Sequence, residues 1–262
     1  MKSVKYFAGV DVGSLTTEVV ILDAQKELAG YGIGLTGANS TKAAKRVLNS
    51  ALSMAGVDND AIRSTVATGY GRGSVPNAGK QVTELSCHAL GSWHLFPETG
   101  TVIDIGGQDA KVIHVGKKGK LLNFAMNVKC AAGTGRFLEV MAAKLEIALE
   151  EMGELSMKAG GEVPISSICT VFAESEVVSL VAQNHPPAEI IRGLHRAIVN
   201  RVGSMVHTVG IHGAVAMTGG VAKNSGVVAF MEEKLGQRVN ISKEPQIVGA
   251  LGAALIAWQN RV

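Results

Sequence analysis

Aromatic residues are scarce in this sequence: they make up 4% of 262 residues, and only 6 prolines are present. Apolar runs are short too, since none reaches the about 20 residues that a membrane-spanning helix needs. The net charge is only +3, from 25 basic and 22 acidic side chains, too mild for a nucleic-acid or anionic-membrane partner. The apolar part of residues 1–10 is too short for a signal peptide. These absences predict a cytoplasmic protein with no nucleic-acid or membrane partner.

Cysteine is also rare: Cys87, Cys130 and Cys169 are an odd number at wide spacing, which argues against a disulfide framework. Glycine, by contrast, is abundant at 32 residues, well above the usual share of about 7%. It follows no three-residue period, which excludes collagen, and the 47% hydrophobic content excludes disorder. Because glycine inside helices and strands costs stability, the excess indicates close approaches of backbone to a ligand or between packed elements.

Two segments resemble each other at a constant offset of 93 residues, which relates Asp11 to Asp104. Residues 10–22 and 103–115 each contain a β-branched strand that ends in Asp-x-Gly, then a polar turn and a second apolar strand. A further polar turn, a third strand-like stretch and mainly helical sequence follow both. The pattern predicts a duplicated α/β unit; chance similarity of two short segments is the alternative.

Apolar residues recur at helical spacing in several stretches between and after these segments. The run at 117–120 is expected to be a solvated hairpin tip. We expect strands over 214–217 and 238–241, and helices over 40–55, 82–95, 135–152, 224–235 and 247–258, with another that follows Pro186-Pro187 and runs to Val209.

The Asp-x-Gly turns carry groups suited to phosphate and metal. Backbone N–H groups and hydroxyls in such turns can bind phosphate oxygens, and Asp11 and Asp104 could hold Mg²⁺ directly or through water. A third turn at 217–224 joins a strand to a helix, and Gly219-Gly220 there would let backbone pass close to a flat ligand such as adenine. Taken singly, each turn could equally be an ordinary hairpin or glycine loop.

With DVGSLTT at 11–17, DIGGQDA at 104–110 and MTGGVAKN at 217–224, the sequence resembles proteins of the acetate kinase/hexokinase/actin/Hsp70 (ASKHA) nucleotide-binding fold. The resemblance implies an α/β protein of two duplicated ribonuclease-H-like halves that clasp ATP. The first half would cover 1–98 and be completed by a C-terminal helix at 247–262. The second would cover 99–246 and hold two of the cysteines and the adenosine turn.

Those cysteines, Cys130 and Cys169, each precede helix-like sequence, and a helix N-terminus favours an anion such as a thiolate. Two thiolates cannot complete a four-cysteine site, and their wide separation argues against a local zinc knuckle. A two-fold dimer can, because the pair then occurs twice around a cluster on the axis. Buried structural thiols are the alternative.

The surrounding residues, CAAGTGRFLE at 130–139 and CTVFAESE at 169–176, closely resemble the ATP-dependent activators of 2-hydroxyacyl-CoA dehydratases, as do ATGYGR at 67–72 and ELSCHA at 84–89. That family includes the ATPase subunits of benzoyl-CoA reductases and the reductases of double-cubane-cluster proteins. The resemblance covers nearly the whole chain. It implies an ATPase that forms a homodimer with one 4Fe–4S cluster, held by Cys130 and Cys169 of each subunit. Ferredoxin or flavodoxin would donate the electron, and a dehydratase, reductase or double-cubane protein would accept it.

The resemblance also assigns roles by position. Asp11 and Asp104 would organise Mg²⁺ and the attacking water, and Gln108 would lie near the terminal phosphate. Whether 133–135 serves the nucleotide or the cluster helix stays open. The residues expected to bind ATP or ADP are Gly13, Ser14, Leu15, Thr16, Thr17, Gly106, Gly107, Gln108, Gly133, Thr134, Gly219, Gly220 and Gln246.

Two positions depart from the family's pattern: Glu18 stands where Lys is common, and Val128 where Asp is common. Glu18 would repel phosphate if it pointed inward. Cys87 is expected to be a packing residue, the seven histidines structural or surface residues, and Arg72 has no role that the sequence indicates. A small-molecule kinase of the same fold without a cluster, and a non-enzymatic ATP-sensing module, are the competing functions.

Overall fold

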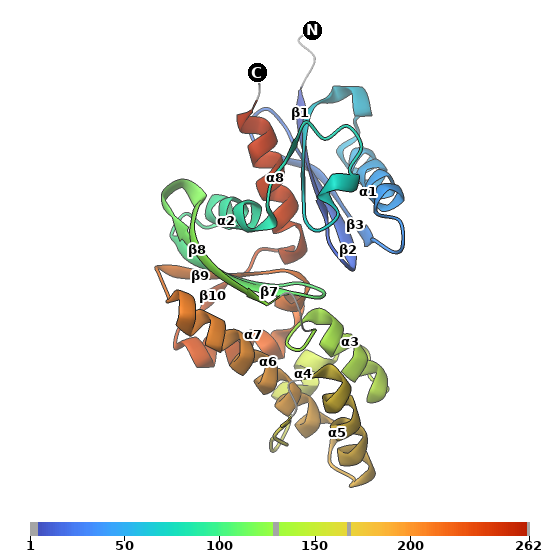
Figure 1. Ribbon diagram of the computed structural model, residues 1–262, viewed down its shortest axis with the longest axis vertical. Helices are drawn as coiled ribbons and strands as arrows, with labels where there is room; N and C mark the ends of the chain where they lie inside the picture. The colour runs from blue at the N-terminus through green and yellow to red at the C-terminus, as the bar shows by residue number, and fades with distance from the viewer. Residues whose placement is uncertain (1–4, 128–130, 167–168, 261–262) are drawn as a thin grey trace. The chain divides into compact units, whose positions relative to one another are not determined.

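The computed structural model describes residues 5–127, 131–166 and 169–260 (Figure 1). The chain divides into two compact units, and the described residues form two β-sheets of five strands each. The first unit comprises Met1–Gly100, Val115–Leu122 and Ser242–Val262, and the second comprises Thr101–His114 and Asn123–Ile241.

The first sheet has the strand order β3-β2-β1-β4-β5. β1 pairs antiparallel with β2, β2 pairs antiparallel with β3, and β4 lies parallel to both β1 and β5. The bounds are β1 (Tyr6–Val12), β2 (Thr16–Leu22), β3 (Leu28–Leu35), β4 (Ile62–Thr68) and β5 (Lys80–Gln81).

Helices cover both faces of this sheet, because alternate side chains of its strands point in opposite directions. Val10 and Val19 pack in one cluster with α1 (Ser40–Ala55). Val20 and Leu22 pack in another with α8 (Val248–Gln259), which also packs on α2 (Glu84–Leu95). The sheet is therefore buried on both sides, between α1 and α8 (Figure 1).

The second sheet repeats this order. Its strand order is β8-β7-β6-β9-β10, which corresponds strand by strand to the order β3-β2-β1-β4-β5 of the first sheet. The duplication expected from the offset of 93 residues is confirmed at the level of sheet order. The bounds are β6 (Thr99–Ile105), β7 (Ala110–Gly116), β8 (Lys120–Asn127), β9 (Ala214–Thr218) and β10 (Val239–Asn240).

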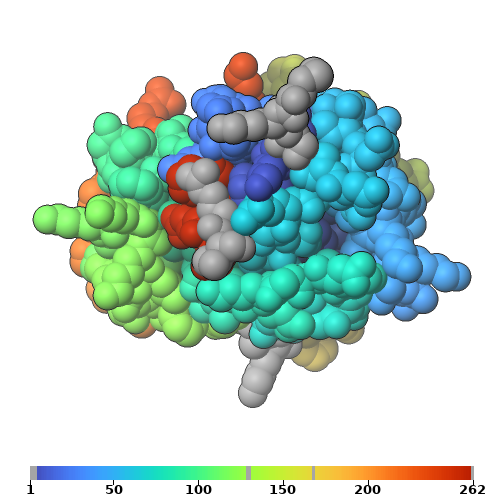
Figure 2. Space-filling view, turned by 90° about the horizontal axis from the view of Figure 1, so that it is seen from above, coloured from blue at the N-terminus to red at the C-terminus, as the bar shows by residue number. Residues whose placement is uncertain are grey.

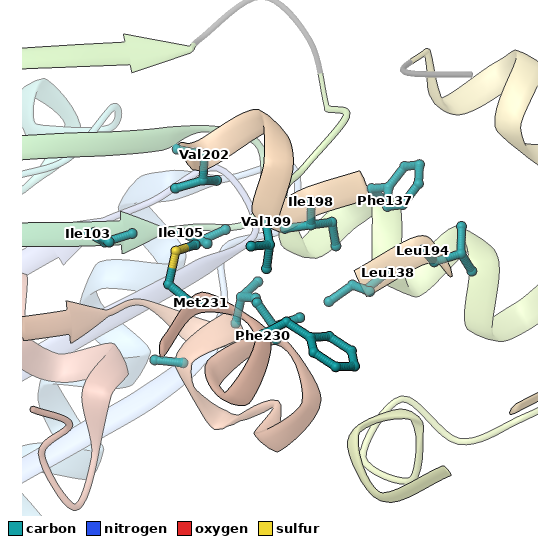
Figure 3. Packing of buried hydrophobic residues seen from close by; sticks show 14 of the residues in the cluster. Ile103, Ile105, Phe137, Leu138, Leu194, Ile198, Val199, Val202, Phe230 and Met231 are labelled. Atoms are coloured by element: carbon teal, nitrogen blue, oxygen red, sulfur yellow. The ribbon is translucent and has the colours of Figure 1, made fainter. Parts of the chain in front are cut away.

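One face of the second sheet carries the largest core cluster. Ile103 and Ile105 of β6 meet Ile198 and Val202 of the long helix α6 (Pro187–Val209) and Phe230 of α7 (Ser225–Leu235) (Figure 3). The other helices of this unit are α3 (Gly135–Lys144), α4 (Met152–Met157) and α5 (Thr170–Ala182).

The helix expected over 135–152 is wrong in extent. α3 ends at Lys144, and Glu146 adopts a positive φ of 54°, which an α-helix cannot contain. α4 then begins at Met152, the residue expected to end the helix. The helix over 40–55 is confirmed at both ends, where the Asn39 side chain accepts from Lys42 N–H and Gly56 adopts the left-handed conformation.

The segment that joins β4 to α2 lies at the surface of the first unit (Figure 2), where Tyr70, Gly73 and Asn77 are exposed. The lysines of the turn between β7 and β8 are exposed as expected, in a short 3-10 turn at Lys117–Gly119. Among the helices that the structure describes, none is both long and apolar enough to cross a membrane.

Candidate functional site

The two Asp-x-Gly turns have the same geometry. In the first, Gly13 N–H donates to Thr16 O at 2.9 Å; in the second, Gly106 N–H donates to Asp109 O at 3.0 Å. Residues related by the offset of 93 thus form equivalent backbone hydrogen bonds. The tips of the turns, at Ser14 and at Gln108, are exposed. Both turns therefore present polar groups to solvent at the ends of buried strands.

Thr36 stabilises the first turn through its side-chain hydroxyl. Its hydroxyl donates to Gly13 O at 2.9 Å and lies 2.9 Å from the hydroxyl of Thr17. The side chain of Thr17 is fully buried. Its hydroxyl therefore shapes the turn, whereas Ser14, Leu15 and Thr16 are all at least partly accessible.

Asp104 is buried in the second unit and held on both sides. Thr218 at the end of β9 donates its hydroxyl proton to Asp104 Oδ1 at 2.8 Å, and Lys111 Nζ of β7 lies 3.3 Å from Asp104 Oδ2. Lys111 Nζ also lies 2.7 Å from Asp109 Oδ2. A single buried ammonium thus links the strand carboxylate to a residue of the turn. Sequence reasoning missed Lys111, although it stands at the position equivalent to Glu18.

Asp11 is the counterpart of Asp104 in the first unit. It lies directly opposite Glu18 on β2 and beside Thr68, the last residue of β4. Residues opposite each other in an antiparallel pair share a face of the sheet, so the two carboxylates are neighbours, and both are buried. α8 approaches this point closely: a Cβ at Gly249 would lie 2.2 Å from Asp11 Oδ2.

A second repeated motif was missed. β4 ends at Thr68 and β9 ends at Thr218, and the glycines that follow, Gly69 and Gly219, have positive φ, 82° and 84°. A Cβ on Gly69 would lie 2.4 Å from Asp11 Oδ1, and one on Gly219 would lie 2.9 Å from Asp104 Oδ1. Each strand aspartate is therefore enclosed by a Thr-Gly turn. The shared dipeptide in ATGYGR and MTGGVA was the available signal.

The start of α3, at Gly135 and Arg136, lies against the second turn. Gly135 N–H donates to Gly106 O at 2.9 Å, and Arg136 N–H donates to Gly107 O at 2.8 Å. α3 therefore begins at the Gly106-Gly107 turn. Thr134 is fully buried, and its hydroxyl donates to Ala131 O at 2.5 Å. Gly135 and Arg136 thus contact the second turn directly, whereas Gly133 and Thr134 immediately precede them in the chain.

The cysteines differ sharply in environment. Cys169 is free and exposed at the start of α5. Cys87 is fully buried, and burial raises the pKa of its thiol to about 12, which makes it a packing residue as expected. Cys130 and Val128 lie outside the described residues, so the expectations for them stay predictions. α5 also exposes large apolar side chains, at Val171, Phe172, Val178 and Val181.

The remaining residues singled out from the sequence lie in or beside turns of the two units. Gln246 lies in a 3-10 turn before α8 in the first unit, where its N–H donates to Glu244 Oε1 at 3.2 Å. Gly219 and Gly220 begin the turn between β9 and α7 in the second unit. Arg72 supports the turn after β4, since it donates to Gly69 O at 2.9 Å and lies 3.6 Å from Glu84.

Comparisons with known proteins agree with this architecture. The chain is 46% identical to the 2-hydroxyisocaproyl-CoA dehydratase activator of Clostridioides difficile, over 97% of this chain and 95% of that protein. It is 47% identical to the (R)-2-hydroxyglutaryl-CoA dehydratase activating ATPase of Acidaminococcus fermentans, over 97% of each chain.

Solved structures give the same result. Component A of the A. fermentans dehydratase matches with a TM-score of 0.93, over 97% of this chain and 98% of that one. The C. difficile activator with bound ADPNP matches with a TM-score of 0.92, over 97% of this chain and 94% of that one.

A ROK family glucokinase from Streptomyces griseus shares the fold at 14% identity, with a TM-score of 0.61 over 97% of this chain and all of that one. The expected ASKHA fold is thereby confirmed. The family model for BadF/BadG/BcrA/BcrD ATPases matches residues 8–257. The chain therefore belongs to the BadF/BadG/BcrA/BcrD ATPase family.

Proposed function

We propose that this protein is an ATP-hydrolysing electron-transfer activator of a 2-hydroxyacyl-CoA dehydratase. It would act as a homodimer with one 4Fe–4S cluster, accept an electron from ferredoxin or flavodoxin, and deliver it at low potential to the dehydratase. A related reductase or a double-cubane protein would be an equivalent acceptor. The observation that carries the proposal is the exposed thiol of Cys169 at a helix start, in a chain of this ATPase family.

Two turns suit phosphate, and their flanking aspartates suit Mg²⁺. The tips of both turns are accessible, and each turn ends a buried strand that fixes its position. Asp104 Oδ1 accepts from Thr218, and Oδ2 faces Lys111. These contacts hold the Asp104 carboxylate in place beside the second turn, and a carboxylate is a group that can hold Mg²⁺ directly or through metal-bound water. We infer that Asp104 acts through water, and that Asp11 with Gly13–Thr16 and Gln108 with Gly106–Gly107 bind and orient the phosphates.

The residues present fit an iron–sulfur cluster shared between two copies. Thiolates are the usual ligands of such clusters, and Cys169 is accessible to a second chain. The apolar side chains that α5 exposes beside it would be buried in a dimer. Cys130 would supply the second ligand of each subunit. When bound, the cluster supplies the one-electron chemistry; the protein sets its potential through hydrogen bonds and exclusion of water.

Nucleotide state could reach the cluster ligands through a short path. α3 starts on the Gly106-Gly107 turn through two backbone hydrogen bonds, and Cys130 precedes that start by five residues in the sequence. A change in the turn on hydrolysis would therefore act on the start of α3. The acceptor is proposed from the relatives, which are named for their dehydratases.

Anaerobic purification tests the proposal. We expect a brown dimer with about four iron per dimer, loss of iron in Cys169→Ser, and retention of iron in Cys87→Ser. ATP hydrolysis should be slow and should accelerate with a dehydratase that is being reduced. A colourless protein after anaerobic reconstitution, or an intact cluster in Cys169→Ser, would refute the redox function. Transfer of phosphate to a sugar or acid would favour the kinase instead.

A further inference from the structure

A fully buried histidine stands at the centre of a hydrogen-bonded network in the second unit. His195 of α6 lies 2.9 Å, through Nδ1, from the hydroxyl of Ser156 in α4. Through Nε2 it lies 3.3 Å from Asn224 Nδ2, immediately before α7. His195 therefore connects three helices at one point, and the phosphate chemistry proposed above does not use it.

The network fixes the proton positions. Ser156 donates its only hydroxyl proton to Gly153 O at 2.9 Å, so its oxygen must accept from His195 Nδ1–H. Asn224 Oδ1 accepts from Val227 N–H at 3.0 Å, so its amide nitrogen must donate to His195 Nε2. His195 is thus a neutral imidazole protonated on Nδ1. Burial, which lowers its pKa to about 4, keeps it neutral at physiological pH.

The packing around this network leaves no room for a side chain at two glycines, Gly226 and Gly153. A Cβ on Gly226 would lie 2.3 Å from Ser156 Oγ and 2.6 Å from His195 Nδ1. A Cβ on Gly153 would lie 2.6 Å from Ser225 Oγ. These two glycines therefore let α4 and α6 pack closely against the first turn of α7. His195 makes a polar contact with Asn224 at the start of that helix.

Asn224 ends the Gly-rich turn after β9. Its N–H donates to Val221 O at 3.0 Å, and Ala222 N–H donates to Gly219 O at 3.2 Å. The side chain of Asn224 caps the N-terminus of α7. We propose that His195 is a positioning residue for nucleotide affinity: by accepting from the Asn224 amide, it holds the Gly219–Lys223 turn in the conformation that receives adenosine. This inference rests on the proposed nucleotide-binding function and deepens it.

Two variants of the same residue separate the two hydrogen bonds. The amide of Asn reaches as far from Cβ as Nδ1, so H195N can donate to Ser156 but leaves the Asn224 amide without its acceptor. The amide of Gln reaches as far as Nε2, so Gln Oε1 in H195Q can accept from Asn224. We expect H195N to raise the KM for ATP about tenfold, the loss of one buried hydrogen bond. kcat should stay within about twofold, and H195Q should restore the KM.

Each variant loses one hydrogen bond and should lower the melting temperature to a similar extent. A purely structural role of His195 therefore predicts similar changes of KM in both variants, whereas the proposed role predicts a change of KM in H195N alone. Equal changes of KM in H195N and H195Q, or an unchanged KM in a folded H195N, would overturn the proposal. Calorimetric titration of the wild-type protein with MgADP is the reference: absence of binding there refutes the nucleotide function itself, not the role of His195.

N224S tests the same bond from its other end, and does so even where H195N does not fold. Serine is a good N-cap, so α7 stays capped while the donor to His195 is lost. We expect N224S to raise KM about as much as H195N. Where both fold, the double variant should raise KM no further, because one bond is removed twice. A change in the double variant equal to the product of the single changes, or an unchanged KM in N224S, contradicts the proposal.

Discussion

Lys111 Nζ lies 3.3 Å from Asp104 Oδ2 in the second unit, whereas the first unit places Glu18 opposite Asp11 at the equivalent positions. Strand register, rather than sequence similarity alone, establishes the equivalence, because Asp104 pairs with Lys111 as Asp11 pairs with Glu18. One duplicated strand pair thus carries a carboxylate–ammonium pair and the other carries two carboxylates. The two halves therefore offer different electrostatics to the phosphates that we propose they bind.

Lys111→Met should destabilise the protein strongly. The ammonium is buried between Asp104 and Asp109, and removing one member of a buried charge cluster costs about 3 kcal/mol. Urea unfolding followed by circular dichroism measures the change in the free energy of unfolding. Lys144→Met is the matched control, since Lys144 pairs with Glu174 at a partly exposed position and should cost no more than about 1 kcal/mol. Equal unfolding midpoints for the two variants would contradict this assignment.

Glu18→Lys should lower the KM for ATP several-fold. Asp11 and Glu18 are buried neighbours, and the substitution would give Asp11 a cationic neighbour like that of Asp104 while removing one negative charge beside the first phosphate turn. Steady-state ATPase assays check this. Glu18→Gln, which removes the charge without reversing it, should fall between the two. A KM that rises in Glu18→Lys would show that Glu18 does not act on the nucleotide through its charge.

His195 should make folding stability depend on pH. Its folded pKa is lowered by burial to about 4 from the ordinary 6.5, so between these values only the unfolded imidazole takes up a proton. Stability is therefore retained above pH 6.5 and is lost as pH falls toward 4. At pH 5 the loss attributable to this residue should be about 2 kcal/mol, measured as the difference in pH dependence between wild type and H195Q. Parallel pH profiles for the two proteins would exclude the effect.

Cys87 should resist alkylation in the folded protein. Its thiol is fully buried with a pKa of about 12, and only the thiolate reacts rapidly. In the double variant C130S/C169S without a cluster, iodoacetamide at pH 8 should leave Cys87 unmodified for hours and modify it in urea, as intact mass would show. The single variant C130S should gain one label, at the exposed Cys169. Labelling of Cys87 without denaturant would show that this core opens.

Much of the fold was predictable because its signals are local. The strand–turn–strand repeats follow from β-branched apolar runs that end in Asp-x-Gly, and α1 follows from helical spacing between an Asn cap and a glycine. The break between α3 and α4 was not predictable from spacing, because apolar residues continue at helical period through Leu145 while Glu146 leaves the helical region.

The candidate site divides in the same way. Asp11, Asp104 and the three glycine turns are recognisable from residues adjacent in the chain. Thr218 is not, because the aspartate that it contacts lies 114 residues away. His195 was expected to be a structural or surface residue because the histidines show no close metal-ligand spacing. Its partners Ser156 and Asn224 are distant in sequence and carry no charge, so no local pattern indicates them.

The sequence by itself determined that this chain is a duplicated α/β protein with phosphate-type turns and two cysteines before helices. Those features depend on residue types at short spacing. Only the tertiary structure decided which groups surround each aspartate, that Thr-Gly recurs beside both, and that a neutral histidine holds the start of α7. These depend on strand register and helix packing, which bring distant residues within hydrogen-bonding distance and which no local pattern encodes.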